Sequence, residues 1–200
     1  MANQRNLRKE KLMKTAAKMF SEKGYDAVTT REITNAAGIN PAALYYYFPS
    51  KADLLKSLYD FYYAERKKKR PDIEELLRLA ETETPKDVLM KAEYHYSDDI
   101  RDLMDQILII AAWSFNSDEM SKRFIQVSIF EDIEVTLRLL LRRLSDLGKI
   151  REIDLDTFLK VLSYYCFSAA ALGNSAYKSG AAEYQTGMAL LFSFLEPAGI

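Results

Sequence analysis

The sequence predicts an all-helical protein, with a three-helix helix-turn-helix head followed by a larger helical bundle. Apolar residues recur at spacings of three and four along most of the 200 residues, as on one face of a helix. No alternating pattern typical of strands stands out. Helix start and stop residues divide the pattern, and Pro71 is the clearest boundary. We therefore expect a head over 1–50, a connecting helix over 50–70 and a body over 71–200.

Composition places the chain among ordinary globular proteins and shows an uneven charge distribution. Hydrophobic residues make up 48% and charged residues 28%. No apolar run reaches the roughly 18 residues of a membrane span, and the one cysteine cannot form an internal disulfide, so we expect a cytoplasmic protein that does not enter membranes. Residues 1–70 carry a net charge of +8, whereas 71–200 carry −9. This asymmetry favours a polyanion-binding head, although chance clustering of solvated side chains would give the same count.

Longer helices are expected at both ends of the head. Apolar residues at helical spacing predict a first helix that ends at Gly24. Ser50, with Asp53 three residues later, predicts the start of the connecting helix. That helix reaches a basic run at 66–70 before Pro71. Cations at a helix C-terminus are stabilised by about 0.3–1 kcal/mol, so we interpret this run as a helix end rather than a nucleic-acid site.

Between these helices, two short helices with a tight turn predict a helix-turn-helix. The first covers 30–37, with Thr29 or the next residue as its N-cap. Gly38 then supplies the positive φ that the turn needs. The second helix starts after Asn40, a capping residue, with Pro41 at its first position. Its outer face is expected to be the functional surface.

Three adjacent tyrosines lie on this second helix, at Tyr45, Tyr46 and Tyr47. Successive helical residues point about 100° apart, so at least one or two of the rings must be exposed. Exposed hydroxyls near Lys51, Arg31 and a basic first helix suit contacts with DNA phosphates. The alternative is a surface aromatic patch used for protein contact.

The stretch from about residue 9 to residue 55 resembles the DNA-binding domain of TetR-family regulators. The resemblance rests on these residues: Thr30, Ala37-Gly38-Ile39, Leu44-Tyr45-Tyr46-Tyr47-Phe48, Ser50-Lys51 and Leu54-Leu55. It implies a homodimer of two-domain subunits that binds a palindromic operator in double-stranded DNA. Such proteins usually repress transcription until a small-molecule effector binds the C-terminal domain.

Carried over residue by residue, the resemblance implies a DNA-contacting set on the two short helices and at the start of the fourth. The set is Thr29, Thr30, Arg31, Asn40, Pro41, Ala42, Ala43, Tyr45, Tyr46, Tyr47 and Lys51. Thr30 and Lys51 would bind phosphates. Tyr45 and Tyr47 would do the same along the second helix, with Tyr47 over a base as the alternative. The residues expected to face base edges are Asn40, Ala42, Ala43 and Tyr46. The sequence departs from the family at Ala42 and Ala43, where many relatives have polar or basic side chains. Part of the specificity would then come from DNA shape.

The body has further predicted helices and an apolar seam near its C-terminus. The helices are expected near 72–82, 85–96, 98–115, 117–147, 154–178 and 181–196, with a break within 117–147. Apolar residues recur along this seam at spacings of three and four, which indicates that another helix packs against it. We predict a dimer interface at Leu159, Leu162, Cys166, Ala169, Gly173, Ala176, Met188, Phe192 and Leu195. The alternative is packing within one chain, and Cys166 is in either case a small buried hydrophobe.

An effector pocket is harder to place. Aromatic and flexible side chains in the body favour an apolar or amphipathic ligand at Met104, Leu108, Trp113, Phe130 and Tyr164, although aromatics at helical spacing are more often core. His95 has no partner at metal-binding spacing, so we interpret it as a surface or pocket-rim residue. With one His, one Cys and no phosphate-binding loop, we expect neither an enzyme nor a cofactor. The alternative function is a DNA-binding protein regulated by a partner, or an architectural one, without a small ligand.

Overall fold

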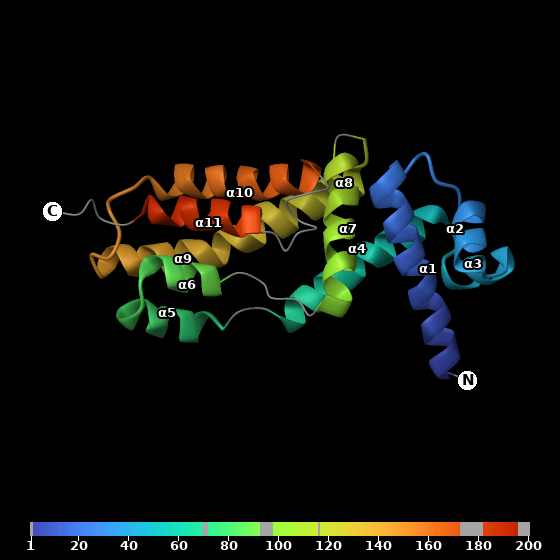
Figure 1. Cartoon of the computed structure of the whole chain (residues 1–200), viewed down its shortest axis with the longest axis horizontal. Coiled ribbons are helices and arrows are strands. Elements are labelled where there is room, and N and C mark those ends of the chain that lie inside the picture. The colour runs from blue at the N-terminus through green and yellow to red at the C-terminus, as the bar shows by residue number, and fades with distance from the viewer. Residues whose placement is uncertain (1, 70–71, 93–97, 116, 173–181, 196–200) are drawn as a thin grey trace. The chain divides into compact units, whose positions relative to one another are not determined.

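The computed structural model describes residues 2–69, 72–92, 98–115, 117–172 and 182–195, and within these ranges every regular element is a helix. The all-helical prediction is therefore confirmed (Figure 1). The chain folds into two compact units. Unit 1 comprises 1–65 and 97–124, and unit 2 comprises 66–96 and 125–200.

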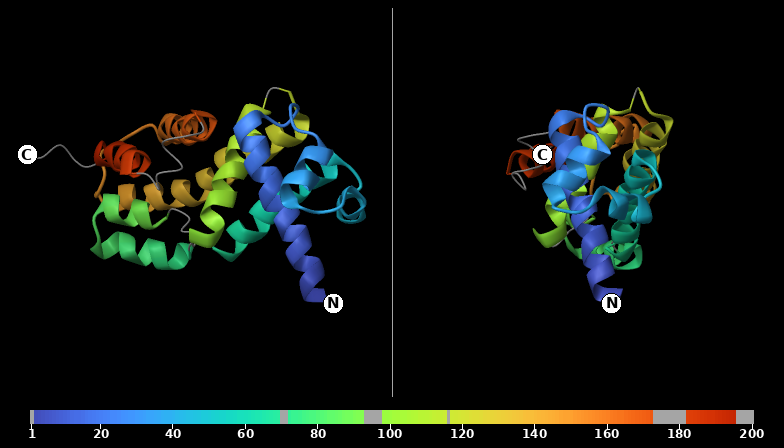
Figure 2. Two further views of the ribbon diagram at one scale, coloured as in Figure 1. Left: turned by 45° about the vertical axis from the view of Figure 1, so that its right-hand side comes forward. Right: turned by 90° about the vertical axis from the view of Figure 1, so that its right-hand side faces the viewer.

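Unit 1 contains the helix-turn-helix and a helix from the predicted body. Its helices are α1 (Ala2–Lys23), α2 (Thr30–Ala37), α3 (Pro41–Tyr47), most of α4 (Lys51–Lys68), α7 (Asp98–Trp113) and α8 (Glu119–Ile125). α1 packs against α2 and α3 and also lies along α7 (Figures 1 and 2). Unit 1 therefore extends beyond the predicted head, because α7 follows Pro71 in sequence but buries apolar side chains with α1.

The core of unit 1 is built from the apolar positions that define its helices. Its fully buried members include Leu12, Ala16, Phe20, Ile33, Leu44, Phe48, Leu54, Leu55 and Leu58. Each large side chain removed from water contributes about 1.5–3 kcal/mol. This burial holds α2 and α3 against α1 and leaves their other faces toward solvent.

Unit 2 is arranged around one long helix. Its elements are α5 (Ile73–Thr82), α6 (Pro85–Lys91), the π-helix η1 (Gln126–Glu131), α9 (Asp132–Asp146), α10 (Leu155–Leu172) and α11 (Ala182–Ser193). α9 contacts α5, α6 and α10, and α11 packs on α6. After α9, the Lys149 ammonium donates to the backbone carbonyls of Glu81 (2.7 Å) and Glu83 (2.9 Å). These bonds satisfy carbonyls at the end of α5, where a helix leaves them without internal partners.

The break expected within 117–147 is a π-helix, η1, between α8 and α9. One other predicted helix is shorter in the structure, since α6 ends at Lys91, short of the expected 96. The helix predicted over 154–178 is present as α10 to Leu172, and 173–178 lie outside the described residues. His95 lies outside the described residues.

Candidate nucleic-acid interface

Local side-chain bonds build the helix-turn-helix. At the start of α2, the Glu32 backbone N–H donates to Thr29 Oγ1 (3.2 Å), and the Thr29 backbone N–H donates to Glu32 Oε2 (2.8 Å). This reciprocal capping box satisfies two otherwise unpaired donors, and it lowers the pKa of the Glu32 carboxyl. At the other end, Gly38 adopts φ 63°, and the N–H groups of Gly38 and Ile39 close the helix with bonds to α2 carbonyls. Thr29 is therefore the N-cap, as one of the two alternatives predicted.

α3 presents one side to the core and the other to solvent. The Ala42 backbone N–H donates to Asn40 Oδ1 (2.9 Å), so Asn40 caps the helix as predicted. Leu44 is fully buried, whereas Asn40, Pro41 and Ala42 are exposed. The side that the sequence assigns to base contact is thus open to solvent.

Two of the three tyrosines are exposed. The exposed fractions are 53% for Tyr45 and 62% for Tyr46, while Tyr47 is half-buried. The prediction that at least one or two of the rings reach solvent is therefore confirmed. The hydroxyls of Tyr45 and Thr30 lie 3.1 Å apart and share a hydrogen bond. This bond places two of the predicted phosphate-binding groups, from α3 and α2, at one point on the surface.

Lys51, at the start of α4, lies on aromatic rings rather than fully in solvent. Its Nζ is 4.1 Å from the centre of the Tyr25 ring and 5.7 Å from that of Phe20. Partial burial lowers the pKa of the Lys51 ammonium, against the opposing effect of nearby Asp26 and Glu32. The rings hold the ammonium beside the first turn of α4 and limit the side-chain freedom that it would lose on binding an anion.

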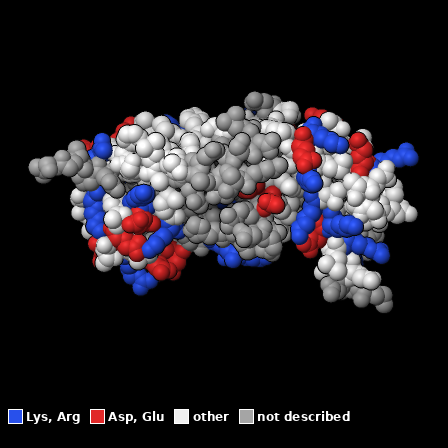
Figure 3. Space-filling model, viewed as in Figure 1, with Lys and Arg blue, Asp and Glu red and all other residues white. Residues whose placement is uncertain are grey.

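The basic first helix, which the sequence already linked to phosphate contact, places two cations beside α3 that were not in the predicted DNA-contacting set. The Arg5 guanidinium carbon lies 4.9 Å from the centre of the Tyr46 ring, and Lys9 Nζ lies 5.7 Å from that of Phe48. Lysine and arginine side chains lie along α1 in Figure 3. The missed signal was the spacing of Arg5, Lys9 and Leu12, which places both exposed cations on the same side of α1 as the buried Leu12.

A buried polar chain fixes α4 within unit 1. The Tyr59 hydroxyl lies 2.7 Å from Ser121 Oγ, which donates in turn to Asp118 Oδ2 (2.5 Å). The Tyr59 ring stacks on Phe124, with ring centres 4.2 Å apart. Burial raises the pKa of the Tyr59 hydroxyl. The hydrogen bonds and the stacking together hold the middle of α4 against α8.

Six of the nine residues predicted for the dimer interface point inward in the single chain. The six whose side chains the structure describes are buried within the single chain: Leu159, Leu162, Cys166, Met188, Phe192 and Leu195. The alternative of packing within one chain therefore holds for these six, because their seam faces the core of unit 2. Ala169 lies in α10 but its side chain is not described, and Gly173 and Ala176 lie outside the described residues.

Other apolar side chains of the same two helices are exposed. They are Val161 and Tyr164 of α10, and Leu190 and Phe194, at and just after the end of α11.

The predicted pocket residues fall in both units. Met104 and Leu108 are buried in α7, whereas Trp113 and Tyr164 are 47% and 62% exposed. Phe130 belongs to η1, and its side chain is not described. The pocket at these five residues stays a prediction.

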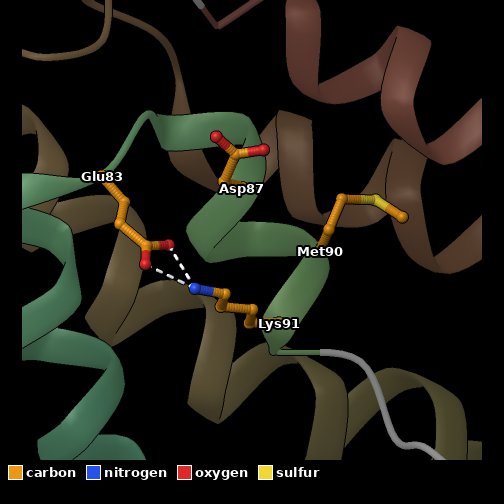
Figure 4. A pocket seen from close by; sticks show the side chains of 4 residues that line it. All are labelled: Glu83, Asp87, Met90 and Lys91. Carbon is orange, nitrogen blue, oxygen red and sulfur yellow. Dashed lines mark hydrogen bonds and ion pairs between the residues drawn. The ribbon is translucent and has the colours of Figure 1, made fainter.

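The described part of unit 2 does contain a pocket of a different character. It has a volume of about 470 Å³ and lies at α6, where Glu83, Asp87, Met90 and Lys91 line it (Figure 4). Lys91 forms an ion pair with Glu83 across it. Three of these four lining residues are charged, and none was predicted as a pocket residue, so this is not the expected apolar site.

Within the described ranges, no three His, Cys, Asp or Glu side chains are grouped closely enough to hold a metal ion. None of the described helices is both long enough and apolar enough to cross a membrane.

Comparison with known proteins agrees with this geometry. The profile of the bacterial regulatory proteins of the tetR family matches residues 12–58, which cover the helix-turn-helix and the first part of α4. Residues 12–58 thus match the tetR family of bacterial regulatory proteins. This confirms the resemblance drawn from the motif.

Relatives extend the likeness. The chain is 33% identical over 129 residues to YerO, an uncharacterized HTH-type transcriptional regulator of Bacillus subtilis, covering 64% of this chain and 44% of YerO. It is 44% identical over 52 residues to IcaR, the negative transcriptional regulator of the biofilm operon icaADBC in Staphylococcus aureus, covering 26% of each. The matches thus span less than half the length of these curated relatives. They are transcriptional regulators rather than enzymes, in agreement with the sequence prediction.

Solved structures share the whole fold. The TetR-family regulator PfmR from Thermus thermophilus superposes with a TM-score of 0.62 at 22% identity, over 93% of this chain and 99% of PfmR. At this identity the likeness establishes the fold, an N-terminal helix-turn-helix followed by a C-terminal helical domain.

Proposed function

We propose that this protein is a homodimeric DNA-binding repressor of transcription that a small apolar or amphipathic ligand releases from its operator. The observation that carries the DNA-binding part is the outward side of α3, with Tyr45 and Tyr46 exposed and cations on both flanks. A neutral or acidic rim would not attract a polyanion. The repressor role draws on IcaR, which is named as a negative regulator.

Some of the proposed contacts position the protein on the DNA backbone, and others read the base sequence. Tyr45, Thr30 and Lys51 bind phosphates, because their polar ends lie exposed or half-exposed around α3. Arg31, exposed on α2, adds a cation to the same rim. Asn40 reads base edges in the major groove, and the methyl group of Ala42 touches thymine methyls. Two such helices, one from each subunit, enter successive major grooves about 34–36 Å apart.

The dimer forms through the exposed sides of α10 and α11. Val161, Tyr164, Leu190 and Phe194 are each about half exposed or more in the single chain. A fully exposed side chain of this kind gains about 1.5–3 kcal/mol on complete burial, so covering the exposed half of each would contribute roughly half of that.

Sedimentation velocity at increasing protein concentration tests this dimer. The wild type is expected to sediment as a dimer and Leu190→Glu as a monomer. The matched control is Leu139→Glu, which changes an exposed leucine of α9 in the same way and should leave the dimer intact. A monomeric wild type, or dissociation by both substitutions alike, would contradict the proposed interface.

The effector binds in unit 2 near η1. π-helical turns are frequent at functional sites, and Ser128 on η1 is buried with no hydrogen-bond partner for its hydroxyl among the described residues. A ligand with one polar group in an apolar body would satisfy that hydroxyl. α4 continues from unit 1 past Glu65 into unit 2, so a shift of α4 would change the spacing of the two recognition helices. Release can be no stronger than the ligand's preference for the released conformation.

Selection of genomic DNA fragments by the purified protein tests the function as a whole. A recovered palindrome is expected, and failure to enrich any sequence in dilute salt would overturn the proposal. On the recovered operator, Lys51→Ala should lower the slope of log K against log salt by about one unit for each subunit of the dimer. Lys56→Ala, on the same helix and paired with Asp60, should not. Asn40→Ala should change which bases are preferred, and an unaltered preference would argue against direct reading at that position.

A further inference from the structure

We propose that the first turns of α1 form a second DNA-binding element, in which Arg5 binds a backbone phosphate beside the recognition helix α3. This inference rests on the proposed function and adds an element that neither the motif nor the family match includes, since that match begins at residue 12. Three features of α1 carry it: exposure, position and charge.

The first turns of α1 have no part in the core. Every side chain described from residue 4 to residue 11 is exposed, and the buried face of the helix begins only at Leu12. In Figure 1 the N-terminal turns extend beyond the part of α1 that packs on α2 and α3. A short helical segment with no buried face is marginal in water, so these turns gain nothing from the core that would explain their basic side chains.

Arg5 nevertheless has a defined position. Its guanidinium lies over the ring of Tyr46, which is itself 62% exposed on the outward side of α3. Lys9, one turn later on the same side of α1, lies over Phe48. A cation over an aromatic face at an exposed site is held by about 0.5–1 kcal/mol. The contact therefore keeps Arg5 at the edge of the surface that α3 offers to DNA.

The contact with Tyr46 also leaves the chemistry of Arg5 available. Arg5 is exposed and its guanidinium carries five N–H donors, so donors remain for a phosphate, which arginine binds with two parallel hydrogen bonds. The ring limits the side-chain freedom that would be lost on binding. A phosphate is the expected partner because Arg5 lies over Tyr46, near the C-terminal end of α3, whereas a recognition helix contacts base edges mainly through its N-terminal residues.

The surrounding charge favours the same partner. Arg8 and Lys11 are exposed on these turns together with Arg5 and Lys9. The one acidic side chain from residue 4 to residue 11, Glu10, forms an ion pair with Lys14 (2.7 Å). The segment therefore carries several cations close to the recognition helix and little opposing charge.

The test compares two substitutions that each remove one positive charge from an exposed position on α1. Arg5→Ala removes the proposed contact, whereas Lys18→Ala removes a charge about 140° away around the helix, on the opposite side. Binding of the full-length protein to a random-sequence duplex that spans two half-sites is measured over a series of salt concentrations. Each lost phosphate contact lowers the slope of log K against log salt by about 0.9. Arg5→Ala should show this loss once for each subunit of the dimer, while Lys18→Ala and the charge-conserving Arg5→Lys should keep the wild-type slope.

Each other outcome overturns a stated part of the reasoning. An equal loss of slope in Arg5→Ala and Lys18→Ala would indicate general electrostatic attraction and overturn the specific contact. A wild-type slope in Arg5→Ala would also overturn that contact. A wild type that binds no duplex in dilute salt would overturn the proposed function as well. A change of operator base preference in Arg5→Ala would overturn the phosphate assignment and indicate that Arg5 reads a base.

Discussion

Replacing Tyr59 with phenylalanine isolates one buried hydrogen bond at the centre of unit 1. The side chain is 3% exposed, its hydroxyl lies 2.7 Å from Ser121 Oγ, and its ring stacks on Phe124. Tyr59→Phe keeps the ring and removes only the hydroxyl. Ser121 keeps its bond to Asp118, so no charged group is left unpaired. The expected cost at pH 7 is about 1 kcal/mol of unfolding free energy, the usual net value of one hydrogen bond.

The same substitution should show a characteristic dependence on alkaline pH. Burial raises the pKa of Tyr59 above that of an unfolded tyrosine, mainly because the phenolate loses its hydration. The stabilising contribution of Tyr59 is therefore complete below pH 10, about the unfolded pKa, and is lost as the pH rises further. The loss approaches about 1.4 kcal/mol per pH unit. The advantage of the wild type over Tyr59→Phe should thus vanish near pH 11, estimated as about 1 kcal/mol divided by that slope.

Urea unfolding followed by fluorescence measures this difference, since the single tryptophan, Trp113, belongs to the same unit. Tyr46→Phe serves as the matched control, because Tyr46 is 62% exposed in that unit and should change the unfolding free energy by less than about 0.5 kcal/mol. The wild type and Tyr59→Phe share all other tyrosines, so the difference between their unfolding free energies reports Tyr59. A difference that stays constant up to pH 11 would refute the argument that burial disfavours the phenolate.

Two further substitutions test local and tertiary contributions separately. Thr29→Ala removes the N-cap of α2 and should cost about 1 kcal/mol in urea unfolding. The hydrogen bonds between Thr29 and Glu32 lower the pKa of the Glu32 carboxyl, so the loss of unfolding free energy in Thr29→Ala should shrink below about pH 4. A loss that does not change with pH would argue against the bond from the Thr29 backbone N–H to Glu32. Gly187→Ala would place a Cβ 2.0 Å from the Tyr165 hydroxyl and 2.7 Å from its Cζ. Thermal unfolding should show that the variant loses about 1–3 kcal/mol of unfolding free energy. Alanine is favoured over glycine in a helix by roughly 1 kcal/mol, and a variant stabilised by that amount would contradict the close approach to Tyr165.

The helix-turn-helix could be predicted almost to the residue because its signals are local. Thr29 and Glu32 are three residues apart, Asn40 caps its own helix, and Gly38 adopts the positive φ that the turn requires. Each interaction joins neighbours in sequence and needs no knowledge of the remaining fold. The family motif lies within the same segment, which is why the resemblance and the profile match agree.

The inward side of α10 could not be predicted in the same way. Helical spacing identified the seam through Leu159 and Leu162 but did not say whether the partner helix belongs to the same chain or to another copy. The packing of α10 on α9 decides this, since it buries the seam and leaves Val161 and Tyr164 outside. Periodicity defines a stripe, and only the neighbouring elements decide what covers it.

The sequence by itself determined the helical class, the turn chemistry of the head and the residues α3 turns outward, because capping, glycine φ and apolar spacing act over a few residues. Only the tertiary structure decided that α7 joins the head in one unit and that Arg5 lies on Tyr46. Those contacts join residues distant in the chain, and they exist because packing α1 against α3 and α7 removes apolar surface from water. Which residues meet in these contacts depends on shape and burial across the whole unit, and a local sequence pattern does not contain that information.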